Sequence, residues 1–287
     1  MIKVDNAVIM AAGTSSRFAP ISYEKPKALV EVKGEILIER QIRQLQEAGV
    51  EDIYIVTGYK AEELQYLKDK FGVKLRHNPD YATRNNNASI KVVEDILKNS
   101  YICCADNYFP ENPFAKEEEA CFYAAPYIEG PTQEWCITTD ENDVMTKVVI
   151  GGRDSWIMMG HVFWDEEFTK KFLEILDAEY DLPETAQKLW EDIYLDHMDE
   201  LVMKIKKYDK NFIFEFDTLD ELRAYDKSYV DHTRSKILQK IAEECQVGEG
   251  DIVDITTIKG DTNEAIGFRF KIKGKEYSYY YKEGLKA

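Results

Sequence analysis

The sequence has no apolar run close to the ~18 residues that a transmembrane helix requires. No signal-peptide pattern precedes its first apolar segment, which begins within a few residues of Met1. We therefore expect a soluble, cytoplasmic protein that does not insert into a membrane.

Cysteine and histidine are scarce, and neither is spaced for a metal site. The 5 cysteines are odd in number and include no C-x-x-C pair, and the 4 histidines show no metal-ligand spacing. Cys103 and Cys104 lie in an apolar run, where a free thiol behaves as a small hydrophobic residue. We therefore expect free thiols in a reducing compartment, with neither a disulfide framework nor a zinc site.

Basic residues are also in deficit, with 37 Lys and Arg against 54 Asp and Glu and a formal net charge of -17. A strongly acidic protein is poorly suited to bind nucleic acid or an anionic membrane. An anionic substrate would therefore have to be met by a local positive site.

A stretch near the start of the chain supplies such a site. Ala7 to Met10 is typical of a buried strand, and the small residues after it let the backbone approach a ligand closely. Successive loop N–H groups form an anion site, to which Arg17 adds a charged fork and Lys27 a point charge. The stretch matches neither a Walker A loop nor G-x-G-x-x-G, and an ordinary strand–loop–helix turn is the alternative interpretation. The combination suggests a cradle for a nucleoside triphosphate.

The run from Val8 to Phe18, continued at Pro26 to Leu29, resembles the signature of the sugar-phosphate nucleotidyltransferase superfamily. The resemblance implies that Arg17 and Lys27 hold the phosphates and serve catalysis. It implies that Ala11, Ala12, Gly13, Thr14, Ser15, Asn86 and Ser89 bind the nucleotide. Gly58 and Tyr59 join this set because they follow a predicted strand of the parallel sheet, and such sheets bind ligands beyond the carboxyl ends of their strands. Many members carry a second glycine where this chain has Ser15, and we expect a modest backbone adjustment there.

Three consecutive asparagines, Asn85 to Asn87, precede a predicted helix. Asparagine is ordinary N-cap and turn material, but its amide can also read the edge of a pyrimidine. The superfamily places base-contacting residues in this loop, which favours Asn86 and Ser89 as nucleotide ligands.

Apolar strands and helical patterns alternate through the first half of the chain, which implies a parallel sheet with right-handed crossovers. Apolar or alternating segments in the later half indicate antiparallel additions. We therefore expect an α/β fold, with a Rossmann-like, mostly parallel nucleotidyltransferase sheet over residues 1–230 and a small α+β extension over residues 231–287. Later elements are expected as a helix from about Thr185 to Met198 and a strand from Phe212 to Phe216.

Asp106 and Asp217 each follow an apolar strand. Two such carboxylates can converge on one hard cation, and Mg²⁺ favours one or two carboxylates together with water and phosphate oxygens. Either residue alone could instead belong to a turn or a helix cap. Both match the metal-binding aspartates of the superfamily, so the resemblance implies that they are ligands of Mg²⁺.

Over residues 1 to about 230, the chain resembles the bacterial choline-phosphate cytidylyltransferases more than the sugar-phosphate branch. The segments that carry this are residues 78–82 with 85–86, 104–108, 134–135, 163–165 and 192–196. The resemblance implies CTP and phosphocholine as substrates. A quaternary ammonium is held by aromatic faces and a nearby carboxylate, and the expected acceptor-binding residues are Trp135, Trp164, Asp192 and Tyr194. Each aromatic could instead be a core residue, and members often have tryptophan where this chain has Leu195.

The segments Ile258–Asn263, Phe268–Phe270 and Gly274–Tyr277 resemble the start of a choline-kinase N-lobe. No catalytic-loop residues follow them, so we expect no kinase activity from this tail alone. It could be a remnant, an interaction module or the beginning of a longer fusion.

The implied reaction is attack of an acceptor phosphate oxygen on the α-phosphorus of CTP, which releases pyrophosphate. It needs in-line positioning and charge neutralisation rather than a covalent nucleophile. The alternatives are a 2-aminoethylphosphonate cytidylyltransferase, a sugar-1-phosphate nucleotidyltransferase, and a non-enzymatic regulatory or docking protein. A homo-oligomer is compatible with the sequence.

Overall fold

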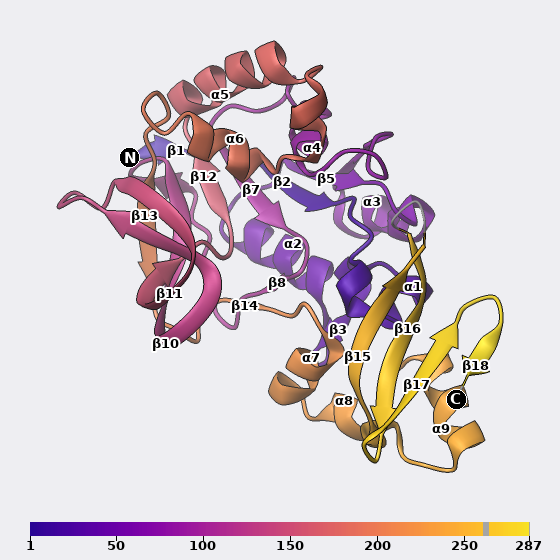
Figure 1. Ribbon diagram of the computed structural model, residues 1–287. Helices are drawn as coiled ribbons and strands as arrows, with labels where there is room; N and C mark the ends of the chain where they lie inside the picture. Colours follow the sequence, from indigo (N-terminus) through magenta and orange to yellow (C-terminus); the bar gives the residue numbers. More distant parts are fainter. Residues whose placement is uncertain (261–263, 287) are drawn as a thin grey trace. The chain divides into compact units, whose positions relative to one another are not determined.

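Figure 1 shows the computed structural model of the chain, in which residues 1–260 and 264–286 are described. The chain forms two compact units. Unit 1 comprises Met1–Gly13 and Ile38–Glu215, and unit 2 comprises Thr14–Leu37 and Phe216–Ala287. Unit 2 thus joins a segment from near the start of the chain to its end. These units are compact groups of residues rather than sequence domains, so the predicted domain limit near residue 230 stays a prediction.

Unit 1 is built on an eight-stranded sheet of order β11-β10-β12-β7-β2-β5-β6, with β13 paired to β10. The pairs β2–β5, β2–β7 and β5–β6 are parallel, whereas β7–β12, β12–β10 and β10–β11 are antiparallel. The predicted parallel sheet with antiparallel additions is therefore confirmed (Figure 1). The strands are β2 (Asn6–Ala11), β5 (Ile53–Thr57), β6 (Lys74–His77), β7 (Ser100–Cys104), β10 (Phe122–Thr139), β11 (Met145–Ile157), β12 (Val162–Trp164) and β13 (Lys204–Tyr208).

The central strands β2 and β5 are mostly apolar because both faces of the sheet are covered. Every residue of β5 is buried, and β2 is buried over its first four residues. Strands covered on both faces have near-continuous apolar runs rather than alternation. In α2 (Leu37–Glu47), the residues Ile38, Ile42 and Leu45 are fully buried, as their helical spacing predicts. The other helices of unit 1 are α3 (Tyr66–Phe71), α4 (Asn87–Lys91), α5 (Glu166–Glu179) and α6 (Trp190–Asp196).

The helix predicted from Thr185 to Met198 is wrong in its start. A 3₁₀ turn over Pro183–Gln187 precedes α6, and the chain is extended between them. The amide of Asn87 donates to the Thr185 carbonyl at 2.9 Å, and the Asn85 N–H donates to the Ala186 carbonyl at 2.8 Å. These carbonyls are satisfied from outside, so the segment need not continue as an α-helix.

The strand predicted from Phe212 to Phe216 is shorter than expected. Only β14 (Phe214–Glu215) pairs, antiparallel to β8 (Asn107–Tyr108).

Unit 2 begins with short turns. They are the 3₁₀ turn η1 (Ser16–Phe18), α1 (Ile21–Glu24), the 3₁₀ turn η2 (Lys27–Leu29) and the hairpin β3 (Glu31–Val32)–β4 (Glu35–Ile36). Its C-terminal part contains α7 (Leu219–Tyr225), α8 (Ser228–Asp231), α9 (Lys236–Cys245) and the 3₁₀ turn η5 (Glu249–Asp251). A four-stranded antiparallel sheet follows, formed by β15 (Ile252–Lys259), β16 (Ala265–Ile272), β17 (Lys275–Tyr280) and β18 (Gly284–Lys286).

The predicted α+β extension is therefore present, but its kinase resemblance stays a prediction. Residues 261–263, which include part of the glycine-containing turn of that resemblance, lie outside the described residues. Within the described part of the chain, no helix is both long and apolar enough to cross a membrane.

Candidate active site

Arg17, Lys27 and Asp217 come together in unit 2, although they are far apart in the sequence. Arg17 Nη1 lies 2.7 Å from Asp217 Oδ2, and Lys27 Nζ lies 3.6 Å from Asp217 Oδ1. The Arg17 side chain is 74% exposed, that of Asp217 32% and that of Lys27 only 5%. Two cations and a carboxylate thus form one charged cluster, in which Arg17 faces solvent.

Lys27 is held in this cluster by its surroundings. Pro26 precedes η2 and is followed at once by Lys27, whose ammonium lies 5.8 Å from the centroid of the buried Phe18 ring. A buried ammonium is costly unless a charge and hydrogen bonds compensate it. The Asp217 carboxylate supplies compensating charge, which favours a fixed position for Lys27 Nζ.

Asp217 is not the cap of the helix that follows it. The N-cap of α7 is Thr218, whose hydroxyl accepts from Glu221 N at 3.2 Å, while the Glu221 carboxylate accepts from Thr218 N at 3.0 Å. This is the capping box that the sequence pattern indicates. The Asp217 side chain is therefore not used in capping and takes part in the charged cluster.

The loop after β2 is positioned by a close backbone approach in unit 1. The Tyr59 N–H donates to the Ala12 carbonyl at 3.0 Å. A Cβ on Gly58 would lie 2.7 Å from that same carbonyl oxygen and 2.7 Å from the Tyr81 side chain, so only glycine fits. Gly13 is exposed within this loop. The contacts of these residues with a nucleotide stay predictions.

Ser15 begins the following turn in the left-handed region, with φ 48° and ψ 43°. This region favours glycine, which explains why a glycine suits the position. Serine adopts this conformation here, and the Phe18 N–H closes the turn on the Ser15 carbonyl at 2.9 Å. The backbone adjustment relative to members with glycine stays a prediction.

Asn86 and Ser89 both make contacts within unit 1. Asn86 Oδ1 accepts from Trp190 N at 2.7 Å, and Asn86 Nδ2 donates to Glu191 Oε2 at 3.0 Å. Ser89 is buried, and its hydroxyl accepts from the Asn78 amide at 3.2 Å. Asn86 makes no side-chain cap bond to its own helix. Its amide instead holds the start of α6, and base recognition by either residue stays a prediction.

Asp106 lies half-buried in the turn between β7 and β8. Burial raises the pKa of the neighbouring Cys104 thiol well above its ordinary range, and the charges of Asp106, Glu191 and Glu215 raise it further. Three carboxylates therefore act on one thiol at the end of β7. Glu215 also accepts from the Asn107 amide at 3.4 Å. This acidic group is where a cationic part of a substrate would be favoured.

Glu191 is a candidate that the sequence analysis missed. Burial raises the pKa of its carboxyl to about 7, although hydrogen bonds from Asn86 and Tyr123 favour the ionised form. The Tyr123 hydroxyl donates to Glu191 Oε1 at 3.4 Å, and its ring stacks on Trp190 with centroids 5.9 Å apart. Glu191 is buried in the short helix α6, whose start the sequence did not predict, so no local pattern pointed to it.

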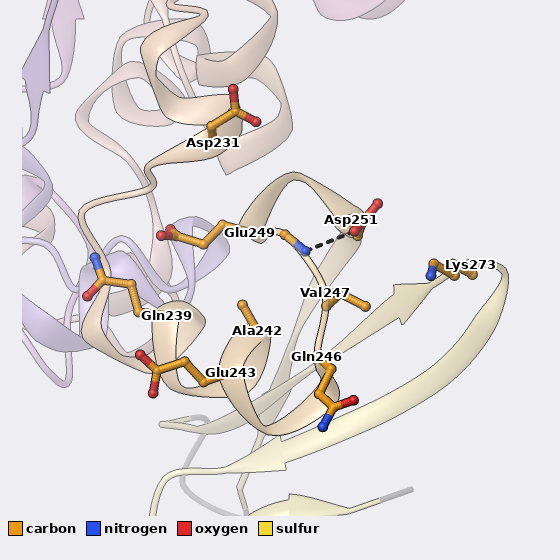
Figure 2. A pocket seen from close by; sticks show the side chains of 10 residues that line it. Asp231, Gln239, Ala242, Glu243, Gln246, Val247, Glu249, Asp251 and Lys273 are labelled. Atoms are coloured by element: carbon orange, nitrogen blue, oxygen red, sulfur yellow. Dashed lines mark hydrogen bonds between the residues drawn. The ribbon is translucent and has the colours of Figure 1, made fainter.

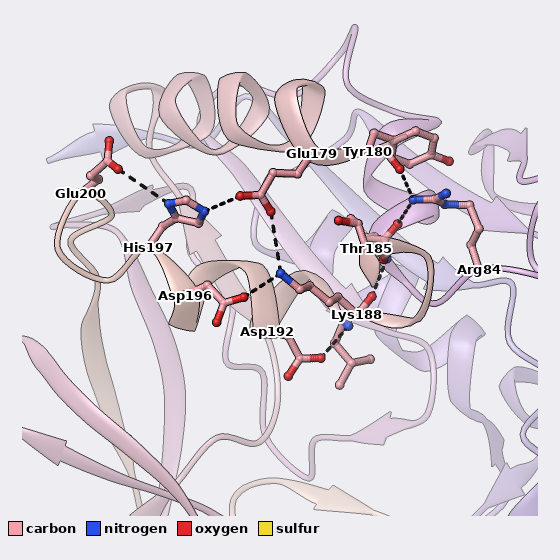
Figure 3. A network of polar contacts seen from close by, with 11 residues as sticks. Arg84, Glu179, Tyr180, Thr185, Lys188, Asp192, Asp196, His197 and Glu200 are labelled. Atoms are coloured by element: carbon pink, nitrogen blue, oxygen red, sulfur yellow. Dashed lines mark hydrogen bonds and ion pairs between the residues drawn. The ribbon is translucent and has the colours of Figure 1, made fainter. Parts of the chain in front are cut away.

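The predicted acceptor residues occupy different environments. Asp192 Oδ2 accepts from Leu189 N at 2.7 Å, so its carboxylate caps α6 (Figure 3). Trp164 and Tyr194 are fully buried in the core, where Trp164 packs on Phe172 with centroids 4.6 Å apart. Trp135, on β10, is half-buried against that core. All four assignments to the acceptor site stay predictions, and Trp135 is the most accessible of the three aromatic residues.

A surface depression of about 590 Å³ lies in the C-terminal part of unit 2 (Figure 2). Its lining includes the carboxyl groups of Asp231, Glu243, Glu249 and Asp251, with Lys273 at its edge. An open, acidic surface is poorly suited to a phosphate substrate. It includes none of the predicted site residues. Among residues 1–260 and 264–286, no three His, Cys, Asp or Glu side chains form a metal-binding group.

Comparisons with known proteins agree with the fold. Residues 7–109 match the family model described as the MobA-like NTP transferase domain. The chain is 34% identical over 221 residues to the choline-phosphate cytidylyltransferase of Streptococcus pneumoniae, covering 77% of this chain and 96% of that protein. It is 32% identical over 235 residues to the 2-aminoethylphosphonate cytidylyltransferase of Lancefieldella rimae, covering 80% of this chain and 95% of that protein.

Solved structures give the same result. The CTP:phosphocholine cytidylyltransferase from Streptococcus pneumoniae is similar with a TM-score of 0.75 at 34% identity, covering 79% of this chain and 99% of that one. A putative glucose-1-phosphate thymidylyltransferase from Bacillus anthracis has the same fold, with a TM-score of 0.62 at 18% identity over 78% of this chain and 95% of that one. The chain therefore belongs to the nucleotidyltransferase family that contains the bacterial choline-phosphate cytidylyltransferases.

Proposed function

We propose that this chain is a cytidylyltransferase that transfers CMP from CTP to phosphocholine, giving CDP-choline and pyrophosphate. The observation that carries the proposal is the convergence of Arg17 and Lys27 on Asp217. These are the residues that the superfamily signature assigns to the phosphates and the metal. Their charges are what a nucleotide triphosphate and its cation require.

Arg17 and Lys27 have distinct tasks in this proposal. Arg17 is mostly exposed and presents several N–H donors, so it can engage phosphate oxygens that arrive from solvent. Lys27 is buried and compensated by Asp217, so its charge is already in place when negative charge develops on the α-phosphorus and the leaving pyrophosphate. A preorganised charge stabilises the transition state without reorganisation.

Members of this family generally use a divalent metal, and we propose Mg²⁺ for this chain. The donor set fits: Asp217 offers a hard carboxylate that is 32% exposed, which leaves room for water and phosphate oxygens. Asp106 is the second carboxylate that the sequence predicts. When bound, the ion would neutralise phosphate charge and orient the reacting groups.

The assignment of phosphocholine as the acceptor requires two features. Its ammonium must contact the Trp135 ring, and the carboxylates around Cys104 must supply negative charge. A quaternary ammonium cannot donate hydrogen bonds and is held by an aromatic face and nearby negative charge. Trp135 is half-buried and keeps part of its ring available. Asp106, Glu191 and Glu215 supply negative charge in the same unit.

A 2-aminoethylphosphonate cytidylyltransferase is the second candidate. The specific observation in its favour is Glu191, a buried carboxyl held by Asn86 and Tyr123 that could accept directly from a primary ammonium. A primary ammonium would depend more on that carboxyl and less on an aromatic face.

The test is pyrophosphate release with CTP and Mg²⁺, measured as kcat/KM for phosphocholine, phosphoethanolamine and 2-aminoethylphosphonate. We expect phosphocholine to be preferred. Trp135→Ala should lower its kcat/KM about thirtyfold if the ammonium is desolvated over the ring, while Trp135→Phe should keep most of it. A preference for 2-aminoethylphosphonate, with equal effects of Trp135→Ala on all acceptors, would reject phosphocholine and make Trp135 a core residue.

A further inference from the structure

The C-terminal sheet of unit 2 contacts the short segment that carries Arg17. The Thr257 hydroxyl, on β15, donates to the Ser16 carbonyl. The Tyr281 ring, directly after β17, stacks on Tyr23 with centroids 3.6 Å apart and an interplanar angle of 6°. These two contacts reach the chain on either side of Arg17, although the residues in the first lie 241 positions apart.

α9 adds a third contact to the same segment. The Ile237 N–H, in the first turn of α9, donates to Glu24 Oε1 at 3.2 Å, one residue beyond the stacked Tyr23. A backbone N–H in the first turn of a helix has no partner within the helix, so it is a favourable partner for a carboxylate. The C-terminal part of unit 2 therefore contacts the segment from Ser16 to Glu24 at three points. They are the Thr257 hydroxyl, the Tyr281 ring and the N-terminus of α9.

We propose that this C-terminal sheet is a positioning element for the triphosphate-binding turn, with Thr257 and Tyr281 as its positioning residues. The proposal rests on the proposed function, because it takes Arg17 to bind the phosphates of CTP. It assigns the tail a role in nucleotide binding rather than treating it as a remnant or a separate module.

The turn needs such support. η1 is a single 3₁₀ turn, and its N-cap Ser15 occupies a left-handed conformation that costs about 1–2 kcal/mol for a non-glycine residue. A 3₁₀ turn has poorer hydrogen-bond geometry than an α-helix and is stable only in short pieces. The Thr257 hydroxyl gives the Ser16 carbonyl a donor immediately after the strained residue. It therefore stabilises the backbone from which Arg17 projects.

Thr257 offers a clean test because β15 has a matched residue beside it. Thr257 is half-buried, whereas Thr256 precedes it on the same strand and is exposed. Valine has the shape of threonine without the hydroxyl donor, and it suits a strand. Thr257→Val should therefore remove the bond to Ser16, Thr257→Ser should keep a hydroxyl there, and Thr256→Val serves as the control.

The experiment uses the full chain and measures KM for CTP, KM for phosphocholine, kcat, the affinity for CTP with Mg²⁺ by calorimetry, and Tm. One hydrogen bond to a neutral carbonyl is worth about three- to tenfold in affinity. We expect Thr257→Val to weaken CTP binding by that factor in both KM and calorimetry, with KM for phosphocholine close to that of Thr256→Val. Thr257→Ser should restore most of the CTP affinity.

Several outcomes would overturn the proposal. Equal CTP affinities for Thr257→Val and Thr256→Val would do so, as would a parallel rise of both KM values or a loss confined to Tm. Tyr281→Leu is a second, independent test. It should also weaken CTP binding without changing KM for phosphocholine. If wild type binds CTP with this dependence on Thr257 but transfers no CMP to any acceptor, the proposed function fails and the positioning role stands. A wild type that does not bind CTP rejects both.

Discussion

Replacing Glu191 by glutamine should change the pH dependence of folding stability. Burial raises the pKa of Glu191 to about 7 in the folded protein, from a reference of 4.5. Between these values the folded chain binds more protons at this site than the unfolded chain, so stability falls as pH rises. For this one carboxyl, the loss between pH 5 and pH 8 is about 2.5 kcal/mol.

Glutamine resembles the protonated carboxyl in shape and can still accept from the Asn86 amide. Urea unfolding followed by tryptophan fluorescence reports on this region, because Trp164 and Trp190 are fully buried near Glu191. We expect Glu191→Gln to be close to wild type at pH 5 and more stable by about 2 kcal/mol at pH 8. The control is Glu174→Gln, which changes an exposed glutamate on α5 and should leave the pH dependence unaltered. Parallel stability curves for Glu191→Gln and wild type would refute the reasoning.

Three further predictions concern the phosphate side of the site and the metal. Lys27→Met keeps the packing against Phe18 but removes a preorganised charge, so kcat at saturating CTP should fall roughly 100-fold; an effect confined to KM would mean that Lys27 only helps to dock the nucleotide. Asp106→Asn should leave Tm unchanged and sharply lower turnover at limiting Mg²⁺, and near-wild-type turnover there would exclude Asp106 as a metal ligand. Ser15→Gly should raise the free energy of unfolding by about 1 kcal/mol in urea titrations, because glycine adopts the left-handed conformation without the penalty; a decrease would contradict that conformation.

The hydrophobic pattern of the sequence predicted the central strands and α2 well, because burial of these elements requires apolar residues at regular positions. The apolar run of β5 indicates a strand buried on both faces. The spacing of Ile38, Ile42 and Leu45 indicates a helix with one buried face. The capping box at Thr218 was equally local, since all of its atoms come from four consecutive residues. Features that depend on neighbours in sequence were therefore accessible.

The choice between Glu191 and Asp192 could not be made in the same way. It depends on the start of α6, and the sequence predicted a helix from about Thr185. The true start at Trp190 puts Asp192 in the first turn, where its carboxylate accepts from Leu189 N at 2.7 Å. Glu191 is then turned inward to Asn86 and Tyr123. The break that sets this start comes from asparagines about a hundred positions away, which no local pattern reveals.

The tail illustrates the same limit over a longer range. The sequence predicted a small α+β extension over residues 231–287, but a strand pattern does not say which segment the inner face of a strand will cover. Thr256 and Thr257 are chemically identical neighbours, and only the register of β15 with β16 decides which of them meets Ser16. Since Arg17, Lys27 and Asp217 lie in the same compact unit as this sheet, the phosphate side of the site and the tail are parts of one packed structure.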